Sequence, residues 1–129
     1  MNQDTHRKHY EQLAKRIHLL SSSSDKLLAQ VACLGLSLPD YARRHRLNIR
    51  TTYRRWQRLE AVLSDPLIIL LEKSPRILPM EYQITVVLWI IEQCSRDEIA
   101  MRMQVPLFKV RERIDGLRLL RTVLRNLNI

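Results

Sequence analysis

The sequence predicts an all-α protein with a small β-wing: a winged helix-turn-helix followed by a second, C-terminal helix-turn-helix-like segment. Three observations predict this fold class. The chain of 129 residues is 46% hydrophobic with only 2 Gly, which favours an ordered helical core. Apolar residues recur at spacings of three and four along much of the chain. Two stretches, beginning at Ser37 and Ser95, each predict a short helix, a tight turn and a longer helix.

The N-terminal region, residues 1–22, predicts one helix over about residues 3–20. Its apolar stripe is narrow, as expected for a helix that packs on a single partner. That partner is either the same subunit or a second copy, so Tyr10, Leu13 and Ile17 are candidate dimer contacts. The serine run 21–24 then ends this helix and caps the next one, predicted over residues 25–36.

The stretch from Ser37 to Leu63 is the most informative part of the chain. Ser37 can cap a first helix and Asn48 a second one. The second helix has an apolar inner face at spacings of four, three and four: Thr52, Trp56, Leu59 and Leu63. In helix-turn-helix proteins the second helix of such a pair enters the major groove of DNA.

The outer face of this motif is dense in arginine. Between Ser37 and Leu59, seven arginines accompany a single acid, Asp40. Guanidinium groups pair with phosphates and with guanine edges, so we expect Arg50 and Arg54, one turn apart, to read bases. The predicted DNA contacts on the motif are Arg43, Arg44, Arg46, Asn48, Arg50, Thr51, Tyr53, Arg54 and Arg58.

Pro66 predicts the end of this helix, and a small β-wing is expected after it. Residues 67–71 and 76–78 are the two expected strands, on either side of residues 73–75. Lys73 and Arg76 are candidate phosphate contacts of this wing, and ordinary loop charge is the alternative. The wing completes a DNA-binding domain predicted over residues 23–80.

Residues 25 to 81 resemble the N-terminal DNA-binding domain of LysR-type transcriptional regulators, without a gap. The resemblance implies a winged helix-turn-helix and does not extend to that family's effector-binding domain. Tyr41 and His45 depart from the family pattern, where a small and an apolar residue stand. The matching residues are Ser37-Leu38, Tyr41-Ala42, Leu47-Asn48, Arg54, Trp56, Leu59-Glu60, Pro66-Leu67-Ile68 and Ile77-Leu78-Pro79.

Residues 81–129 are predicted as a linker helix followed by the second helix-turn-helix-like segment. The run 81–94 is apolar on nearly every side and, at about 14 residues, suits a buried helix rather than a bilayer span. By resemblance to the LysR-type linker helix, which pairs two subunits, Val86, Trp89 and Ile90 are candidate dimer contacts. A core within one chain is the alternative.

The second motif begins with the Ser-x-x-Glu capping box of Ser95 and Glu98, and Pro106 opens a long helix to about residue 127. It overlays on the first motif at an offset of 58 residues. Its outer face differs, since Leu107 and Phe108 suit a dimer or partner contact better than a phosphate-rich groove. The alternative is a second DNA contact, for which this motif has the basic residues Lys109, Arg111, Arg113, Arg118 and Arg121.

Composition narrows the function classes. The net charge of +9 and the pI near 10.3 favour an anionic partner. Four scattered histidines, no Gly-rich phosphate loop and no nucleophile elbow argue against an enzyme, a metal site and a cofactor. Without a long apolar run or a signal-peptide core, a cytoplasmic location is expected and no membrane partner. Cys33 and Cys94 are expected to be buried thiols.

The function predicted from the sequence is sequence-specific binding of double-stranded DNA by a transcriptional regulator. It would act as a homodimer that inserts the helix 49–63 into the major groove. The alternative is a regulatory interaction protein that binds another transcription factor or a polymerase subunit, with DNA binding secondary or lost. Leu107, Phe108 and the apolar segment around Trp89 motivate that alternative.

Overall fold

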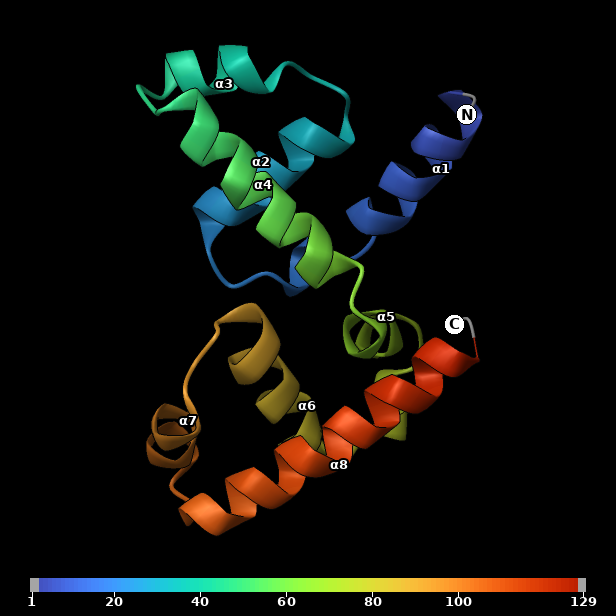
Figure 1. The fold of residues 1–129 in the computed structure, drawn as a ribbon, viewed down its shortest axis with the longest axis vertical. Coiled ribbons are helices and arrows are strands. Elements are labelled where there is room, and N and C mark those ends of the chain that lie inside the picture. The colour runs from blue at the N-terminus through green and yellow to red at the C-terminus, as the bar shows by residue number, and fades with distance from the viewer. Residues whose placement is uncertain (1–2, 128–129) are drawn as a thin grey trace. The chain divides into compact units, whose positions relative to one another are not determined.

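The computed structural model describes residues 3–127, which form helices joined by short turns (Figure 1). No β-strand occurs within residues 3–127, so the helical part of the predicted fold class agrees with the structure and the wing does not. In chain order the elements are α1 (Gln3–Ala14), the 3-10 helix η1 (Ile17–Leu19), α2 (Ser23–Cys33), α3 (Leu38–Arg44), α4 (Ile49–Leu63), α5 (Pro66–Lys73), the 3-10 helix η2 (Pro75–Ile77), α6 (Met80–Val86), the π-helix η3 (Val87–Ile91), α7 (Arg96–Met103) and α8 (Leu107–Asn126).

The chain divides into two units between Ser64 and Asp65. The first unit contains α1 to α4, and the second contains α5 to α8. The domain limits predicted near residues 22 and 80 therefore each fall inside a unit. Each unit holds one of the two predicted helix-turn-helix motifs.

The predicted β-wing is wrong, because residues 66–73 form helix α5 and residues 75–77 form η2. The Asp65 carboxylate accepts a hydrogen bond from the Leu67 N–H at 2.9 Å, which caps α5. Pro66 occupies the first helical turn, where a missing N–H costs nothing. Leu67, Ile68 and Leu71 are all buried, which is the spacing of a helix rather than a strand.

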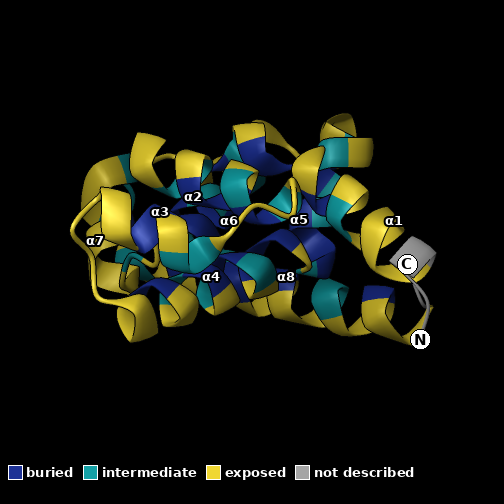
Figure 2. Ribbon diagram, turned by 90° about the horizontal axis from the view of Figure 1, so that it is seen from above, coloured by how far each residue is buried: buried dark blue, intermediate teal, exposed yellow. Residues whose placement is uncertain are grey.

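The core of the first unit is formed where α2, α3 and α4 meet (Figure 2). Leu28 from α2, Ala42 from α3 and Leu63 from α4 are fully buried. Because Ala42 has only a methyl side chain, α3 can approach α4 closely. The inner face predicted for α4 is buried at all four positions, 52, 56, 59 and 63.

Helix α1 is attached to this core by side chains that reach α4. The ring of Tyr10 lies 6.4 Å from the ring of Trp56, measured between centroids. Arg16, just after α1, donates a hydrogen bond from Nη1 to the carbonyl oxygen of Leu63 at 2.9 Å. Leu13 and Ile17, two of the predicted dimer contacts, are buried within the chain and Tyr10 is half-buried.

The second unit has its own apolar core, built from Leu88, Ile99, Val110 and Ile114. At the other end of α8, Arg121 binds the carboxylate of Asp65 at 3.1 Å. This ion pair connects the long helix to the cap of α5.

The segment predicted as a linker helix over residues 81–94 is α6 continued by η3, and it ends at Ile91. Val86 and Ile90 are buried within the chain. The ring of Trp89 is covered by the guanidinium of Arg121, 4.6 Å from its centroid. These three residues therefore pack within the chain, and the dimer contact through them stays a prediction.

Candidate nucleic-acid interface

The helix-turn-helix of the first unit is shaped by two N-caps. The Ser37 hydroxyl accepts the N–H of Asp40 at 3.2 Å at the start of α3. The Asn48 side-chain oxygen accepts the N–H of Thr51 at 3.1 Å at the start of α4. Between them the chain reverses with a hydrogen bond of 2.7 Å from Leu47 N–H to the carbonyl of Ala42. Both caps are the residues that the sequence predicts.

The turn places Arg46 in the left-handed region, with φ of 55°. Glycine is the residue that this backbone conformation favours, and any other residue costs about 1–2 kcal/mol there. The turn itself therefore does not select an arginine at this position. Gln93 and Gln104 have the same positive φ, so the backbone conformation by itself assigns no function to Arg46.

Replacing Arg46 by glycine is expected to raise the free energy of unfolding by up to about 1 kcal/mol, because the relief of strain in the turn is partly offset by the greater freedom of glycine in the unfolded chain. The same variant should bind random duplex DNA more weakly, because a cation is lost. Chemical denaturation and a gel-shift titration measure the two effects. Gln104→Gly is the matched control, since Gln104 has φ of 56° and no charge. A destabilised Arg46→Gly protein would contradict this account.

The outer face of α4 is open to solvent in the described structure. Ile49 is 48% exposed and Tyr53 is 43% exposed, while Arg50 and Arg54 are also exposed. The predicted base-reading residues thus lie on the face opposite Trp56. Arg44 and Arg46 continue this exposed surface into α3 and the turn.

The arginines of the motif fall into two groups. Within residues 3–127, no hydrogen bond or ion pair engages the side chains of Arg44, Arg46, Arg50 and Arg54. Arg43 makes an exposed ion pair with Asp40 at 3.3 Å. Arg58 lies 3.4 Å from a carboxylate oxygen of Asp25, so this predicted phosphate contact is already partly engaged within the unit.

Asp25 is a residue that sequence reasoning missed. Its Oδ1 accepts two hydrogen bonds from Arg55, from Nε at 2.9 Å and from Nη2 at 2.7 Å, and this charged contact forms a clamp between α2 and α4. Ser24 accepts a further bond of 2.6 Å from the same guanidinium. Nothing local in the sequence signals this contact, because Asp25 and Arg55 are thirty positions apart. The clamp orients α4 rather than offering Arg55 to a ligand.

Replacing Asp25 by asparagine is expected to destabilise the protein by about 1–3 kcal/mol, because Arg55 loses its ionic partner in a half-buried site. Urea denaturation measures the change. Asp40→Asn is the control: it removes an exposed pair with Arg43 and should cost less than about 1 kcal/mol. Equal losses in the two variants would show that the Asp25 clamp contributes no more than a surface ion pair.

The other predicted DNA contacts, Lys73 and Arg76, are not part of this motif. Lys73 ends α5 and Arg76 lies in η2, both exposed and both in the second unit. The wing that would have aligned them with a phosphate backbone is absent from the described residues.

The second helix-turn-helix repeats the backbone geometry of the first at the offset of 58 residues. Gln104 occupies the left-handed turn position of Arg46. The hydrogen bond from Val105 N–H to Ala100 O corresponds to the bond from Leu47 to Ala42. Its capping box is complete, with Ser95 N–H donating to Glu98 Oε1 at 2.9 Å and Glu98 N–H donating to Ser95 Oγ at 3.2 Å. These bonds hold the pKa of Glu98 below its usual range.

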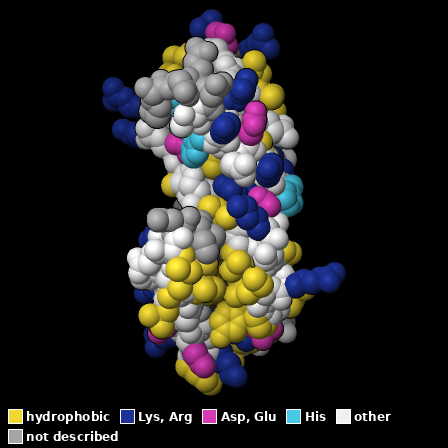
Figure 3. All heavy atoms as spheres, turned by 90° about the vertical axis from the view of Figure 1, so that its right-hand side faces the viewer, with side chains coloured by type: hydrophobic (Ala, Val, Ile, Leu, Met, Phe, Trp, Pro, Cys, Tyr) yellow, Lys and Arg dark blue, Asp and Glu magenta, His cyan; other side chains and the backbone are white. Residues whose placement is uncertain are grey.

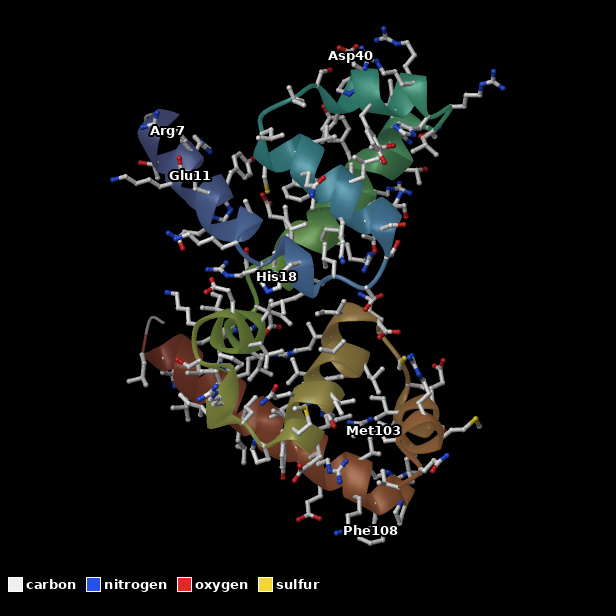
Figure 4. All side chains as sticks on the ribbon, turned by 180° about the vertical axis from the view of Figure 1, so that it is seen from behind. Arg7, Glu11, His18, Asp40, Met103 and Phe108 are labelled. Atoms are coloured by element: carbon white, nitrogen blue, oxygen red, sulfur yellow. The ribbon has the colours of Figure 1, made fainter. Side chains whose placement is uncertain are left out.

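The surfaces of the two motifs differ despite this shared backbone. Phe108, 63% exposed, stands where the first motif has Arg50, and it projects from the start of α8 (Figure 4). Met101, 79% exposed, stands in the place of Arg43. Arg102 matches Arg44 but is bound to Glu92 at 2.9 Å. Leu107, the other predicted partner contact on this face, is half-buried, so only part of its side chain is open to a partner.

Charge is distributed unequally between the units. The first carries twelve Lys and Arg against five Asp and Glu, for a net charge of +7, and the second carries ten against eight, for +2. On the face that Figure 3 shows, basic side chains are spread over the first unit and hydrophobic side chains gather on the second. An anionic ligand is therefore attracted mainly by the first unit.

The cysteines are free thiols, and both are half-buried. Burial, followed by the negative charge of Glu60, raises the pKa of Cys33 to about 11. Such a thiol is a poor nucleophile at neutral pH. Three or more metal-binding side chains do not come together anywhere in the described residues. None of the helices described is both long and apolar enough to cross a membrane.

Alkylation of Cys33 by iodoacetamide at pH 7.5 is expected to run about a hundredfold more slowly than that of an unperturbed cysteine, because so little of it is thiolate. Mass spectrometry of the peptide containing Cys33 measures the rate. The rate should keep rising up to about pH 11, where the thiol ionises. A plateau near pH 8.5 would contradict the raised pKa.

No protein-family model, curated protein or solved structure matches this chain.

Proposed function

We propose that this protein is a cytoplasmic transcriptional regulator that binds double-stranded DNA in a sequence-specific manner as a homodimer. Helix α4 enters the major groove with its outer face, and α3 with the following turn lies along the phosphate backbone. The observation that carries the proposal is the set of four exposed arginines, 44, 46, 50 and 54, for which the described structure provides no partner. Exposed, unneutralised guanidinium groups on such a motif suit an anionic ligand.

The arrangement divides the work among these side chains. Arg50 and Arg54 are one turn apart on α4, so both can reach base edges in one groove. Arg44 and Arg46 lie before α4 and are assigned to phosphates, which position the protein without reading sequence. The N–H groups at the start of α4 favour a phosphate there. Lys73 and Arg76 are left out of the proposed surface, because the wing that motivated them does not form.

Salt dependence tests the proposal. With about two phosphates neutralised by each chain, through Arg44 and Arg46, a log–log plot of the association constant against salt should have a slope of about −2, and about −4 for a bound dimer. Fluorescence anisotropy on duplexes selected from a random pool, and on random duplex, gives both slopes and the specificity ratio. Negligible binding of either duplex at about 50 mM salt would refute the proposal.

A second candidate function is favoured by the surface of the second motif. Exposed Met101 and Phe108 occupy positions that are arginines in the first motif. Exposed apolar groups on such a face suit a protein partner, for which the same chain would be a regulatory interaction protein. Replacing Phe108 by serine should then abolish the complex with that partner in native mass measurements while leaving random-duplex binding unchanged.

A further inference from the structure

A groove in the first unit lies between α1 and α2. Its volume is about 570 Å³, which is within the range of small-molecule sites. Helix α1 and η1 form one wall and α2 forms the other. The lining residues are Tyr10, Glu11, Ala14, Ile17, His18, Lys26, Gln30, Cys33 and Leu34.

The groove has one polar end and an apolar body. His18 lies in η1, which connects the two helices and packs against α2 (Figure 4). Lys26 lies near the start of α2 and lines the same end of the groove. Ala14, Ile17 and Cys33 provide apolar lining. Cys33 remains a neutral thiol at physiological pH, because burial raises its pKa to about 11. The lining therefore suits a molecule with an apolar body and a charged end.

The charge of that end follows from how the ionisable lining residues are paired. Glu11 is already beside a cation, since Arg7 Nε lies 3.8 Å from its carboxylate (Figure 4). Lys26 is half-buried, and its ammonium makes no ion pair or hydrogen bond with any residue in the described range 3–127. An unpaired ammonium beside an apolar groove is complementary to an anion.

We propose that the groove between α1 and α2 binds a small organic carboxylate with an aryl or alkyl body, whose carboxylate pairs with Lys26. The apolar body lies along Ala14, Ile17 and Cys33. Gln30, on the turn of α2 between Lys26 and Cys33, can donate an additional hydrogen bond to the carboxylate.

The ligand would act as an effector, because α1 touches both the groove and the recognition helix. Tyr10 lines the groove and contacts Trp56 on α4. The neighbouring His9 places Nε2 3.7 Å from the Glu60 carboxylate on α4. A ligand that draws α1 and α2 together changes these contacts and hence the position of α4. This regulatory role rests on the proposed DNA-binding function, whereas ligand binding itself does not.

Isothermal titration calorimetry on the full chain tests the site with three carboxylates: phenylacetate, 4-phenylbutyrate and octanoate. At least one should bind with a dissociation constant of about 1 mM or lower, and its uncharged amide should bind about tenfold more weakly. Lys26→Gln should remove the preference for the acid over the amide, while the exposed Lys15→Gln should retain it. Binding of none of the three acids, or equal binding of acid and amide, would overturn the proposal.

A second variant tests the location without altering charge. Ala14 is exposed and lines the groove, so Ala14→Phe fills the groove and should abolish carboxylate binding while the far-UV circular dichroism stays unchanged. Native mass measurement on this variant identifies the competing occupant. If the variant loses a dimer that the parent forms, and no acid binds the parent, the groove belongs to a second copy and the proposal is wrong.

The effector role has its own readout. The bound acid should change the affinity for selected duplex by about threefold or more, and this change should vanish in Lys26→Gln. An acid that binds but leaves duplex affinity unchanged would refute the effector role and keep the site. If the protein binds no duplex, the proposed function fails, and calorimetry still decides the site.

Discussion

Arg54→Ala is expected to weaken binding to the preferred duplex by about 1–3 kcal/mol and to relax the preference at one base pair. The reason is that Arg54 lies one turn after Arg50 on the exposed face of α4 and has no partner within the described structure. Arg44→Ala, by contrast, should weaken preferred and random duplex alike and make the salt slope shallower by about one. Anisotropy titrations of both duplexes at several salt concentrations separate the two results.

The control for this prediction is Arg125→Ala, which removes one exposed positive charge from α8 in the second unit. It should leave both affinities close to those of the parent. Equal losses for Arg54→Ala on preferred and random duplex would show that this residue contributes charge rather than base recognition. A comparable loss for Arg125→Ala would move the interface away from α4.

Trp56→Ala is expected to destabilise the first unit by about 3–5 kcal/mol, the cost of truncating a buried aromatic side chain. Trp56 is only 7% exposed and supports both the ring contact with Tyr10 and the inner face of α4. DNA binding should be lost with it, because α4 no longer presents its arginines on a fixed surface. Hydrogen exchange resolved by peptide measures this loss of stability, through faster exchange of amides in α2 and α4.

Trp89→Ala is the matched variant in the second unit. Trp89 is half-buried beneath Arg118 and Arg121, so its truncation should cost less than that of Trp56. The faster exchange should then appear in α6 and α8 rather than in α4, with duplex binding retained. Loss of duplex binding in the Trp89 variant, or protection of α4 in the Trp56 variant, would contradict the assignment of recognition to the first unit.

The α3–turn–α4 motif could be predicted from the sequence because its signals are local. Ser37 caps the start of α3 and Asn48 caps the start of α4. The spacing of apolar residues places Trp56 on the inner face of α4. The capping box of Ser95 and Glu98 is local in the same way, and both of its hydrogen bonds form. Such interactions span three or four residues and need no distant partner.

The β-wing was predicted wrongly because a proline can follow the end of one helix and also stand in the first turn of the next. Pro66 ends α4, as predicted, but it also begins α5 behind the Asp65 cap. A short apolar run such as residues 67–71 suits either a strand or a buried helix, so its pattern does not discriminate. Burial of Leu67, Ile68 and Leu71 on one face decides for the helix.

The sequence by itself determined the helical class, the two capped motifs and the arginine-rich outer face, since each depends on neighbours along the chain. Only the tertiary structure decided which arginines are available to a ligand and where a small molecule can enter. Asp25 engages Arg55 and Arg58 across thirty or more positions, and the groove beside Lys26 exists because α1 packs on α2. Ion pairing and burial depend on distance in space, which residue order does not specify for segments that meet only after folding.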